Sequence, residues 1–296
     1  EPILPDTRLQ KFAQILVDHS TQVQKGDRVA ITTSTEAIPA VKELYRLILQ
    51  RGGNPHVLID FPGQDELFFQ NADDDQIKFV PLFHKMAFEE FDVLIKIRAD
   101  ENTRALAAVD PKRQAGRQKV IFSLLQAQLR RGADKSLRWV SSLYPTNAYA
   151  MEAGMGLRDY EDFVYRAMHA DESTPDPVAH WQGVKTNQQG IIGRIEGHHR
   201  VELRGPNVDL SLSIKGRTFN NACGEHNLPD GEIYTGPVEN SANGWVKYTY
   251  PAMYQGRIVD GIQLEFEEGK VVQGRATENE EFLLKMLETA AGARSL

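Results

Sequence analysis

Residues 28–32 read Arg-Val-Ala-Ile-Thr and begin the stretch that decides the fold, residues 28–61. This mainly apolar run predicts a buried strand. Residues 36–50 carry apolar side chains at helical spacing, and Gly52-Gly53 end that helix. Residues 56–61 predict a second strand. Because parallel strands joined through a helix form a right-handed crossover unit, this stretch predicts a parallel sheet.

The same alternation continues on both sides of this unit. Residues 7–23 predict an amphipathic opening helix, and residues 111–131 predict another helix. Residues 92–97 and 137–142 predict further strands. Strands that alternate with helices indicate a doubly wound parallel sheet with helices on both faces, so residues 1–174 are expected to form an α/β domain.

The second half of the chain has a different pattern of predicted secondary structure. Residues 171–177, Asp-Glu-Ser-Thr-Pro-Asp-Pro, are typical of a linker, and a helix is expected over residues 177–190. Strands are expected next, over 201–204, 209–214, 245–250, 257–266 and 270–275, with a closing helix over 278–291. We therefore expect a second, β-rich (α+β) domain over residues 175–296.

Composition narrows the classes of function. The 296 residues include 34 basic and 41 acidic side chains, a net charge of −7, which argues against nucleic acid as a partner. No apolar run approaches the roughly 18 residues that span a bilayer, so no membrane partner is expected. The single cysteine, Cys223, rules out an internal disulfide and favours a cytoplasmic location.

A candidate metal ligand lies at a turn. Pro229-Asp230-Gly231 is a turn signal, and Glu232 follows it at the start of a short strand. A carboxylate held at a rigid junction suits a divalent metal ion. Glu232 could equally be a solvated residue beside a hairpin turn, and the residues alone leave both readings open.

Three other groups of residues could carry chemistry. Cys223 could be a nucleophile near His226, although a small buried thiol is the simpler reading. His198 and His199 are adjacent, so on a strand they would point to opposite faces and could not readily chelate one ion. The Ser/Thr-rich residues 32–35 could hold an anion, but capping of the next helix is favoured.

One long run carries a family resemblance. The residues from Asn227 to Ser241, Asn-Leu-Pro-Asp-Gly-Glu-Ile-Tyr-Thr-Gly-Pro-Val-Glu-Asn-Ser, are followed by Tyr-Pro-Ala-Met-Tyr-Gln-Gly at residues 250–256. Together they resemble the central signature of the thermophilic-aminopeptidase family of metallopeptidases, the M29 type. A weaker resemblance covers residues 25–53.

The resemblance implies a set of site residues and a cofactor. Glu232 matches a ligand of a site that holds two divalent ions, which are zinc, cobalt or manganese. The residues expected to shape its turn are Asn227, Asp230 and Gly231. Apart from the resemblance, possible residues of the substrate pocket are His226, Glu239, Tyr250 and Tyr254, although the residue pattern favours packing of the sheet for the two tyrosines. The resemblance also implies a homodimer that acts on peptides.

The function implied is that of a metal-dependent aminopeptidase, a hydrolase that releases N-terminal residues through a water activated by two metal ions. The alternative is a non-catalytic relative that binds peptides or assembles with a partner. The sequence departs from the family because the remaining ligands and catalytic residues would be expected beyond Leu296. We therefore expect an incomplete second domain and no activity from the 296 residues alone.

Overall fold

The computed structural model describes residues 6–254, 257–290 and 292–296. The chain forms two compact units. Glu1–Gln188 and Ala222–Glu232 form the first, called here the α/β unit, and Gln189–Asn221 and Ile233–Leu296 form the second, called the β unit. This division differs from the sequence-based boundary at residues 174–175, which stays a proposal.

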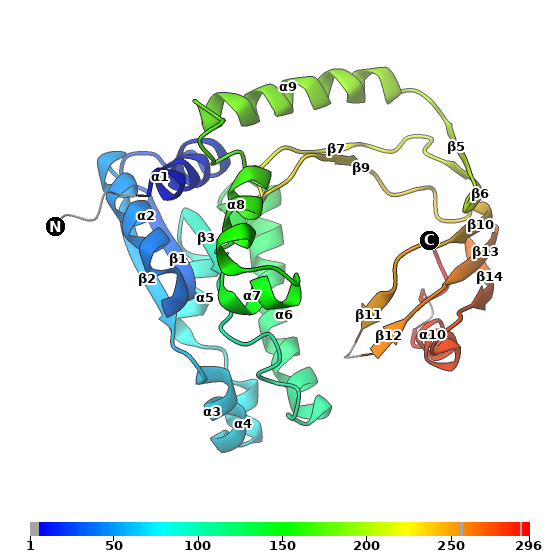
Figure 1. Cartoon of the computed structure of the whole chain (residues 1–296), viewed down its shortest axis with the longest axis horizontal. Helices are drawn as coiled ribbons and strands as arrows, with labels where there is room; N and C mark the ends of the chain where they lie inside the picture. Colours follow the sequence, from blue (N-terminus) through cyan, green and yellow to red (C-terminus); the bar gives the residue numbers. More distant parts are fainter. Residues whose placement is uncertain (1–5, 255–256, 291) are drawn as a thin grey trace. The chain divides into compact units, whose positions relative to one another are not determined.

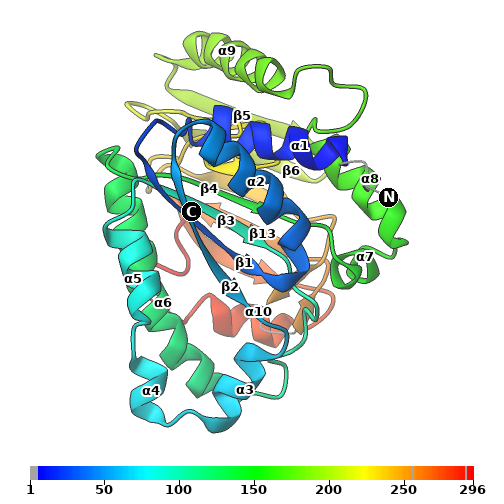
Figure 2. The same ribbon diagram turned by 90° about the vertical axis from the view of Figure 1, so that its left-hand side faces the viewer.

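A parallel sheet forms the centre of the α/β unit (Figures 1 and 2). Its strands are β1 (Arg28–Ser34), β2 (Asn54–Asp60), β3 (Val93–Arg98), β4 (Arg138–Leu143) and β8 (Asn227–Leu228). Their order is β2-β1-β3-β4-β8, and every neighbouring pair is parallel. The parallel sheet predicted from the sequence is thus confirmed.

Helices cover both faces of this sheet. The helices of this unit are α1 (Thr7–Gln14), η1 (Ile15–Ser20), η2 (Thr35–Ala37), α2 (Ile38–Gln50), α3 (Gln64–Asn71), α4 (Asp74–Lys78), α5 (Leu82–Glu89), α6 (Pro111–Ala133), α7 (Asn147–Glu152) and α8 (Leu157–Ala167). The predicted opening helix continues from α1 into the π-helical turn η1. In Figure 2, α1 and α2 lie on one face of the sheet, and α5 and α6 lie on the other.

The strand sequences explain why both faces are covered. Side chains alternate along a strand, so Val29 and Ile31 belong to the core beneath α1 and α2, whereas Ala30 belongs to the core beneath α5 and α6. Strand β3 divides its side chains in the same way, with Ile95 on the first face and Leu94 on the second. A strand that is apolar at successive positions therefore needs helices on both sides.

Strand β8 is the element that sequence patterns missed. Its two residues pair with β4 in the register Ser141 to Asn227 and Ser142 to Leu228. The Ser142 Oγ also donates a 2.7 Å hydrogen bond to the Leu228 carbonyl oxygen. The start of the motif that carries Glu232 is thus part of the parallel sheet, although the sequence analysis assigned it to the second domain.

The β unit is built on an antiparallel sheet. Its strands are β5 (Arg200–Gly205), β6 (Val208–Ser213), β10 (Asn243–Lys247), β13 (Gln263–Glu267) and β14 (Lys270–Arg275), in the order β14-β13-β10-β6-β5. The ribbon of β11 (Ala252–Tyr254) and β12 (Arg257–Val259) and the helix α10 (Glu280–Met286) complete it. Leu210, Ala242, Phe266 and Val271 form its core. The β-rich second half is thus confirmed as a fold class.

Two expected elements of the β unit differ from the structure. The strand expected over residues 257–266 is divided between β12 and β13, because Gly261 adopts a left-handed φ of +64° beside Thr277. The closing helix ends at Met286 and does not reach residue 291. Short apolar runs predicted the presence of these elements better than their ends.

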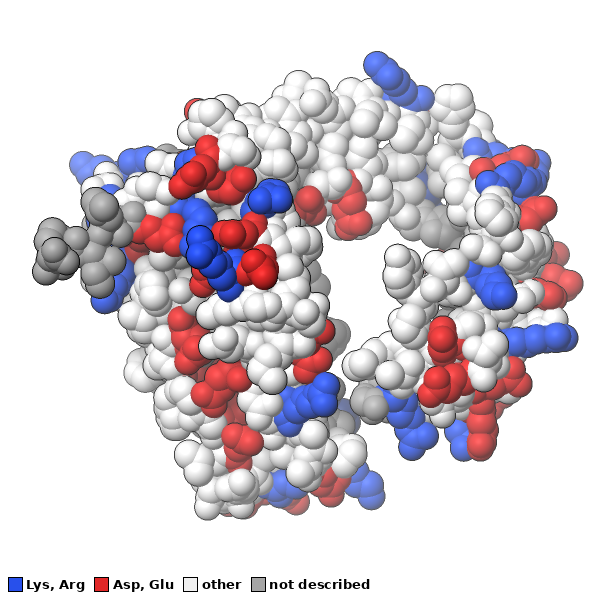
Figure 3. Space-filling view, viewed as in Figure 1, with Lys and Arg blue, Asp and Glu red and all other residues white. Residues whose placement is uncertain are grey.

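The connections between the units are the helix α9 (Pro177–Ile195) and the strands β7 (Asn220–Ala222) and β9 (Glu232–Tyr234), which pair with each other. Acidic and basic side chains are interspersed on the face shown in Figure 3, with no continuous basic stripe. Among the described residues, no helix is long and apolar enough to cross a membrane.

Candidate functional site

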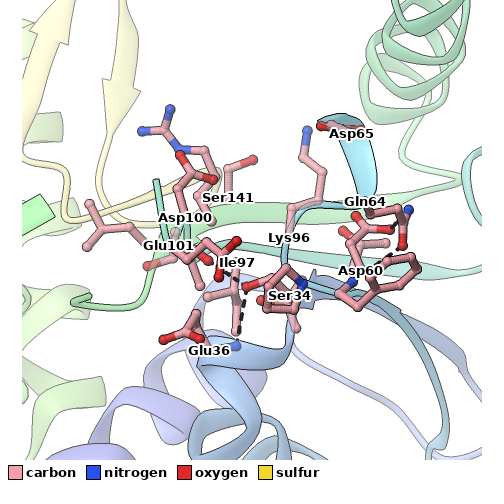
Figure 4. Close-up of a pocket in the computed structure, with 18 of the residues that line it drawn as sticks. Ser34, Glu36, Asp60, Gln64, Asp65, Lys96, Ile97, Asp100, Glu101 and Ser141 are labelled. Carbon is pink, nitrogen blue, oxygen red and sulfur yellow. Dashed lines mark hydrogen bonds between the residues drawn. The ribbon is translucent and has the colours of Figure 1, made fainter. Parts of the chain in front are cut away.

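A cavity of about 740 Å³ lies in the α/β unit at the carboxyl edge of the parallel sheet. The ends of β1, β2, β3, β4 and β8 all contribute to its wall, with the loops that follow β2 and β3 (Figure 4). Its volume falls within the range of about 300–1,000 Å³ that is typical of small-molecule sites. The fold therefore provides a concave site of suitable size.

Topology explains the position of this cavity. The chain runs from β1 outward to β2, then returns to place β3 on the other side of β1. The loops after β1 and β3 consequently leave the sheet toward opposite faces, which opens a crevice between their carboxyl ends. Ser34 lies on one side of the crevice, and its Oγ donates a 2.5 Å hydrogen bond to the Ala99 carbonyl oxygen on the other.

The wall of the cavity carries charges of both signs. Asp60 ends β2 at the mouth of the cavity, Asp65, Asp100 and Glu101 lie in the segments that follow β2 and β3, and Lys96 rises from β3 (Figure 4). Partial burial raises the pKa of Asp65, and the charge of Asp60 adds to the rise. The mouth is therefore mainly acidic, whereas a cation lies inside.

The candidate metal turn joins β8 to β9 a few residues beyond the cavity wall. Asn227, Leu228 and Pro229 line the cavity, and the turn continues through Asp230 and Gly231. Gly231 has a φ of +125°, which a residue with a Cβ rarely adopts, and its N–H donates to the Ala222 carbonyl oxygen over 3.0 Å. The expectation that Asn227 and Gly231 shape this turn remains a proposal.

The Asp230 side chain holds the turn through a hydrogen bond to the backbone of the preceding loop. Its Oδ2 accepts a 3.0 Å hydrogen bond from the Gly224 N–H. Burial raises the pKa of Asp230, the backbone N–H groups of Gly224 and Gly231 oppose that rise, and the charge of Glu232 adds to it. The Asp230 carboxylate is thus engaged in holding the loop.

His226 is held on the other side of the same loop. Its ring stacks on Trp139 with a centroid separation of 4.6 Å, and its Nδ1 lies 3.2 Å from the Trp139 carbonyl oxygen. This contact needs a proton on Nδ1, which leaves Nε2 as the ring atom that could accept a hydrogen bond or bind a metal. His226 directly precedes β8 and Asp230 follows it, and the charge of His226 lowers the pKa of Asp230.

The candidate site residues divide between the two units. Glu232 begins β9 with an exposed side chain, in the same segment as Asp230 and His226. Glu239 and Tyr250 belong to the β unit, where Tyr250 is 83% exposed. Tyr254 ends β11, and its side chain lies outside the described residues.

The described residues do not fit a complete two-metal centre. Across the part of the chain that the structure describes, no group of three or more His, Cys, Asp and Glu side chains is placed to hold a metal ion. Two bridged ions require several ligands that converge on them. The assignment of Glu232 as a metal ligand therefore stays a prediction.

The thiol is not placed for nucleophilic chemistry. Cys223 is 1% exposed, and burial raises its pKa to about 11. It is therefore protonated at neutral pH, whereas a nucleophilic cysteine must ionise. His198 and His199 lie in the connection between α9 and β5, where both side chains are exposed.

Sequence reasoning missed Lys96 and the acidic mouth of the cavity. Asp60 is the last residue of β2 and Asp100 lies two residues after the end of β3, so their position at the carboxyl ends of strands was a usable signal. Lys96, in contrast, interrupts an apolar strand, and the sequence alone does not say on which face such a residue lies.

The chain thus combines a parallel α/β unit with an antiparallel β unit, and the Pro-Asp-Gly-Glu turn lies where the chain leaves the first for the second. The model of the thermophilic metalloprotease (M29) family matches residues 5–296, and the chain belongs to that family. Aminopeptidase 2 of Geobacillus stearothermophilus is 26% identical over 98% of this chain and 75% of its own length. Aminopeptidase T of Thermus thermophilus is 24% identical over 97% and 75%.

A solved structure supports the same fold. Wild-type AmpT from Thermus thermophilus matches 98% of this chain and 76% of its own length, with a TM-score of 0.82 at 21% identity. The chain thus spans about three quarters of the length of each of these relatives.

Proposed function

We propose that this protein is a metal-dependent aminopeptidase that releases N-terminal residues from peptides, with Glu232 as a metal ligand. The observation that carries the proposal is the position of Glu232 in a member of the M29 family. It follows a turn held by the Asp230–Gly224 hydrogen bond, and its side chain is exposed at the start of β9. A ligand that is oriented before the ion arrives does not have to be ordered on binding.

The cofactor in this proposal is a pair of divalent ions, which are zinc, cobalt or manganese. When bound, such ions lower the pKa of a water molecule and polarise the scissile carbonyl. Oxygen ligands accept all three metals, so a carboxylate such as Glu232 does not select among them. His226, which directly precedes β8, could orient the free amine of a peptide through Nε2.

The ligand count leads to a second part of the proposal. Because one residue matches a ligand, the 296 residues alone should neither hold two ions tightly nor release amino acids from peptides. We also propose a homodimer and a cytoplasmic location. The single cysteine and the net charge of −7 are consistent with that location.

The experiment is a peptidase assay on the full natural protein with added zinc, cobalt or manganese, with metal content measured on the same samples. We expect release of single N-terminal residues that stops when a chelator removes the metal. A protein without this activity under all three metals would favour the non-catalytic alternative, which keeps the fold to bind peptides.

A further inference from the structure

Lys96 is a cation inside the cavity that has no anionic partner among the described residues. Its Nζ donates a 3.0 Å hydrogen bond to the neutral Gln128 Oε1 and lies 5.8 Å from the ring centroid of Trp139. Burial lowers the pKa of Lys96, and the neighbouring charge of Arg98 lowers it further. A half-buried ammonium group with neutral partners is stabilised when an anion binds beside it.

Two polar groups next to the cavity lack partners as well. Thr33 lines the cavity and is 7% exposed, and its Oγ1 has no hydrogen-bond partner within the described part of the chain. Gln128, which holds Lys96, is fully buried, and its Nε2 also has none there. Buried polar atoms of this kind are usually satisfied, so the unpartnered Thr33 hydroxyl in the cavity wall favours a polar occupant, whereas Gln128 does not line the cavity and is connected to it through its hydrogen bond with Lys96.

The mouth of the same cavity has the opposite charge. Asp60 ends β2 and Asp65 follows it, Asp100 and Glu101 follow β3, and Figure 4 shows Lys96 between these two pairs. Of these carboxylates, Asp60 accepts a 2.8 Å hydrogen bond from Gln64 Nε2. The cavity thus offers a cation inside and several carboxylates at the entrance, an arrangement complementary to a ligand with both charges.

A nucleotide is a poor match for this arrangement. Phosphate sites at the carboxyl edge of a parallel sheet use a glycine-rich loop after the first strand. Here β1 ends at Ser34 and passes directly into η2 through Thr35 and Glu36, without glycine and with a carboxylate that lines the cavity. The acidic mouth would repel a group with two negative charges more strongly than a single carboxylate whose own ammonium group follows it.

We propose that this cavity binds a small zwitterion, an amino acid or a short peptide with free termini, with its carboxylate beside Lys96 and its ammonium group among the carboxylates of the mouth. The volume of about 740 Å³ leaves room for a short peptide. This binding needs no metal ion, so it goes beyond the proposed aminopeptidase function and does not depend on it.

The test is calorimetric titration of the full natural protein with alanyl-alanine in the presence of a chelator, which prevents turnover. We expect binding of the dipeptide, and an affinity at least roughly tenfold lower when its carboxylate is amidated or its amine is acetylated. An absence of binding, or equal affinity for the capped and uncapped peptides, would overturn the proposal. Tighter binding of inorganic phosphate at the same site would do so too.

A variant that removes the charge of Lys96 then tests which end of the dipeptide lies beside this residue. Lys96→Met keeps the chain length and removes the cation, so the affinity for the dipeptide should fall roughly tenfold or more and the penalty for amidation should disappear. The penalty for acetylation should remain. Lys42→Met removes an exposed lysine of α2 and should leave both penalties intact. An amidation penalty that persists in Lys96→Met would refute the placement of the carboxylate.

Discussion

Replacement of Gly224 by alanine tests whether the segment that carries Glu232 is an integral part of the α/β unit. Gly224 lies in the loop between β7 and β8. This loop contacts His19 and Ser20, which also belong to the α/β unit. His19 Nε2 lies 2.8 Å from the Cys223 carbonyl oxygen, and Ser20 Oγ donates to the Gly224 carbonyl oxygen over 2.5 Å. These contacts hold the loop against η1.

Two terms set the expected loss of stability. Gly224 has a φ of +83°, and an alanine in this left-handed region costs about 1 kcal/mol relative to glycine. A Cβ at this position would lie 3.0 Å from Trp181 Cε3, and Trp181 is 1% exposed, so its ring cannot move aside. Overpacking of this kind costs about 1–3 kcal/mol, so we expect a total of about 2–4 kcal/mol.

The assay is urea unfolding followed by tryptophan fluorescence, with Gly26→Ala as the matched control. Gly26 belongs to the same unit and has a φ of +92°, but a Cβ there would have no atom within 4 Å. Gly26→Ala should therefore lower the free energy of unfolding by the backbone term alone, about 1 kcal/mol. The difference between the two variants isolates the contact with Trp181.

Equal losses in the two variants would refute the reasoning. They would mean that the loop does not pack on Trp181 in solution. The turn with Glu232 would then lack the support that the structure gives it.

Three further predictions follow from the same contacts. Asp230→Asn should change the free energy of unfolding by less than about 0.5 kcal/mol, because the amide oxygen can still accept a hydrogen bond from Gly224 and a buried charge is removed. Asp230→Ala should lower the free energy of unfolding by about 1–2 kcal/mol in urea unfolding. Equal effects of the two variants would contradict this prediction. Burial lowers the pKa of His180, and the charge of His169, whose ring centroid lies 3.6 Å from that of His180, lowers it further. The stability associated with neutral His180 is therefore present above pH 6.5 and is lost as the pH falls through the lowered pKa of His180 in the folded state. His169→Asn, at a φ of +55° that asparagine tolerates, should reduce this loss in thermal unfolding between pH 7 and pH 5, and an unchanged pH profile would count against it. Limited proteolysis distinguishes the two proposed divisions of the chain: the sequence-based boundary predicts a first cut within 171–177, whereas a first cut beyond Gln188 would favour the compact units.

The parallel sheet could be predicted because its strands are apolar at successive positions and alternate with amphipathic helices. The end of a helix is less visible. The π-helical turn after Gln14 and the early end of α10 at Met286 are not marked by any proline or glycine at these positions. Strand β8 could not be found in this way, because two residues show no periodicity and their pairing with β4 joins positions 86 apart in the sequence.

In the candidate site too, some features could be predicted from the sequence and others could not. The turn at Asp230 and Gly231 was visible because proline, aspartate and glycine have strong local preferences. The contact of Asp230 with Gly224 follows from the loop closing on itself, which no local pattern records. Lys96, with Gln128 and Trp139 around it, depends on which face of β3 it occupies, and only the assembled sheet decides that.

The measurement that tests the central claim most directly compares Glu232→Gln with Glu172→Gln in the full natural protein, by turnover of a short peptide and by bound metal. Glu172 is an exposed residue in the segment before α9. The account predicts that Glu232→Gln binds metal more weakly and, at saturating metal, loses activity by on the order of a hundredfold or more, while Glu172→Gln keeps both. Unchanged metal content and turnover in Glu232→Gln would contradict the assignment of Glu232 as a metal ligand.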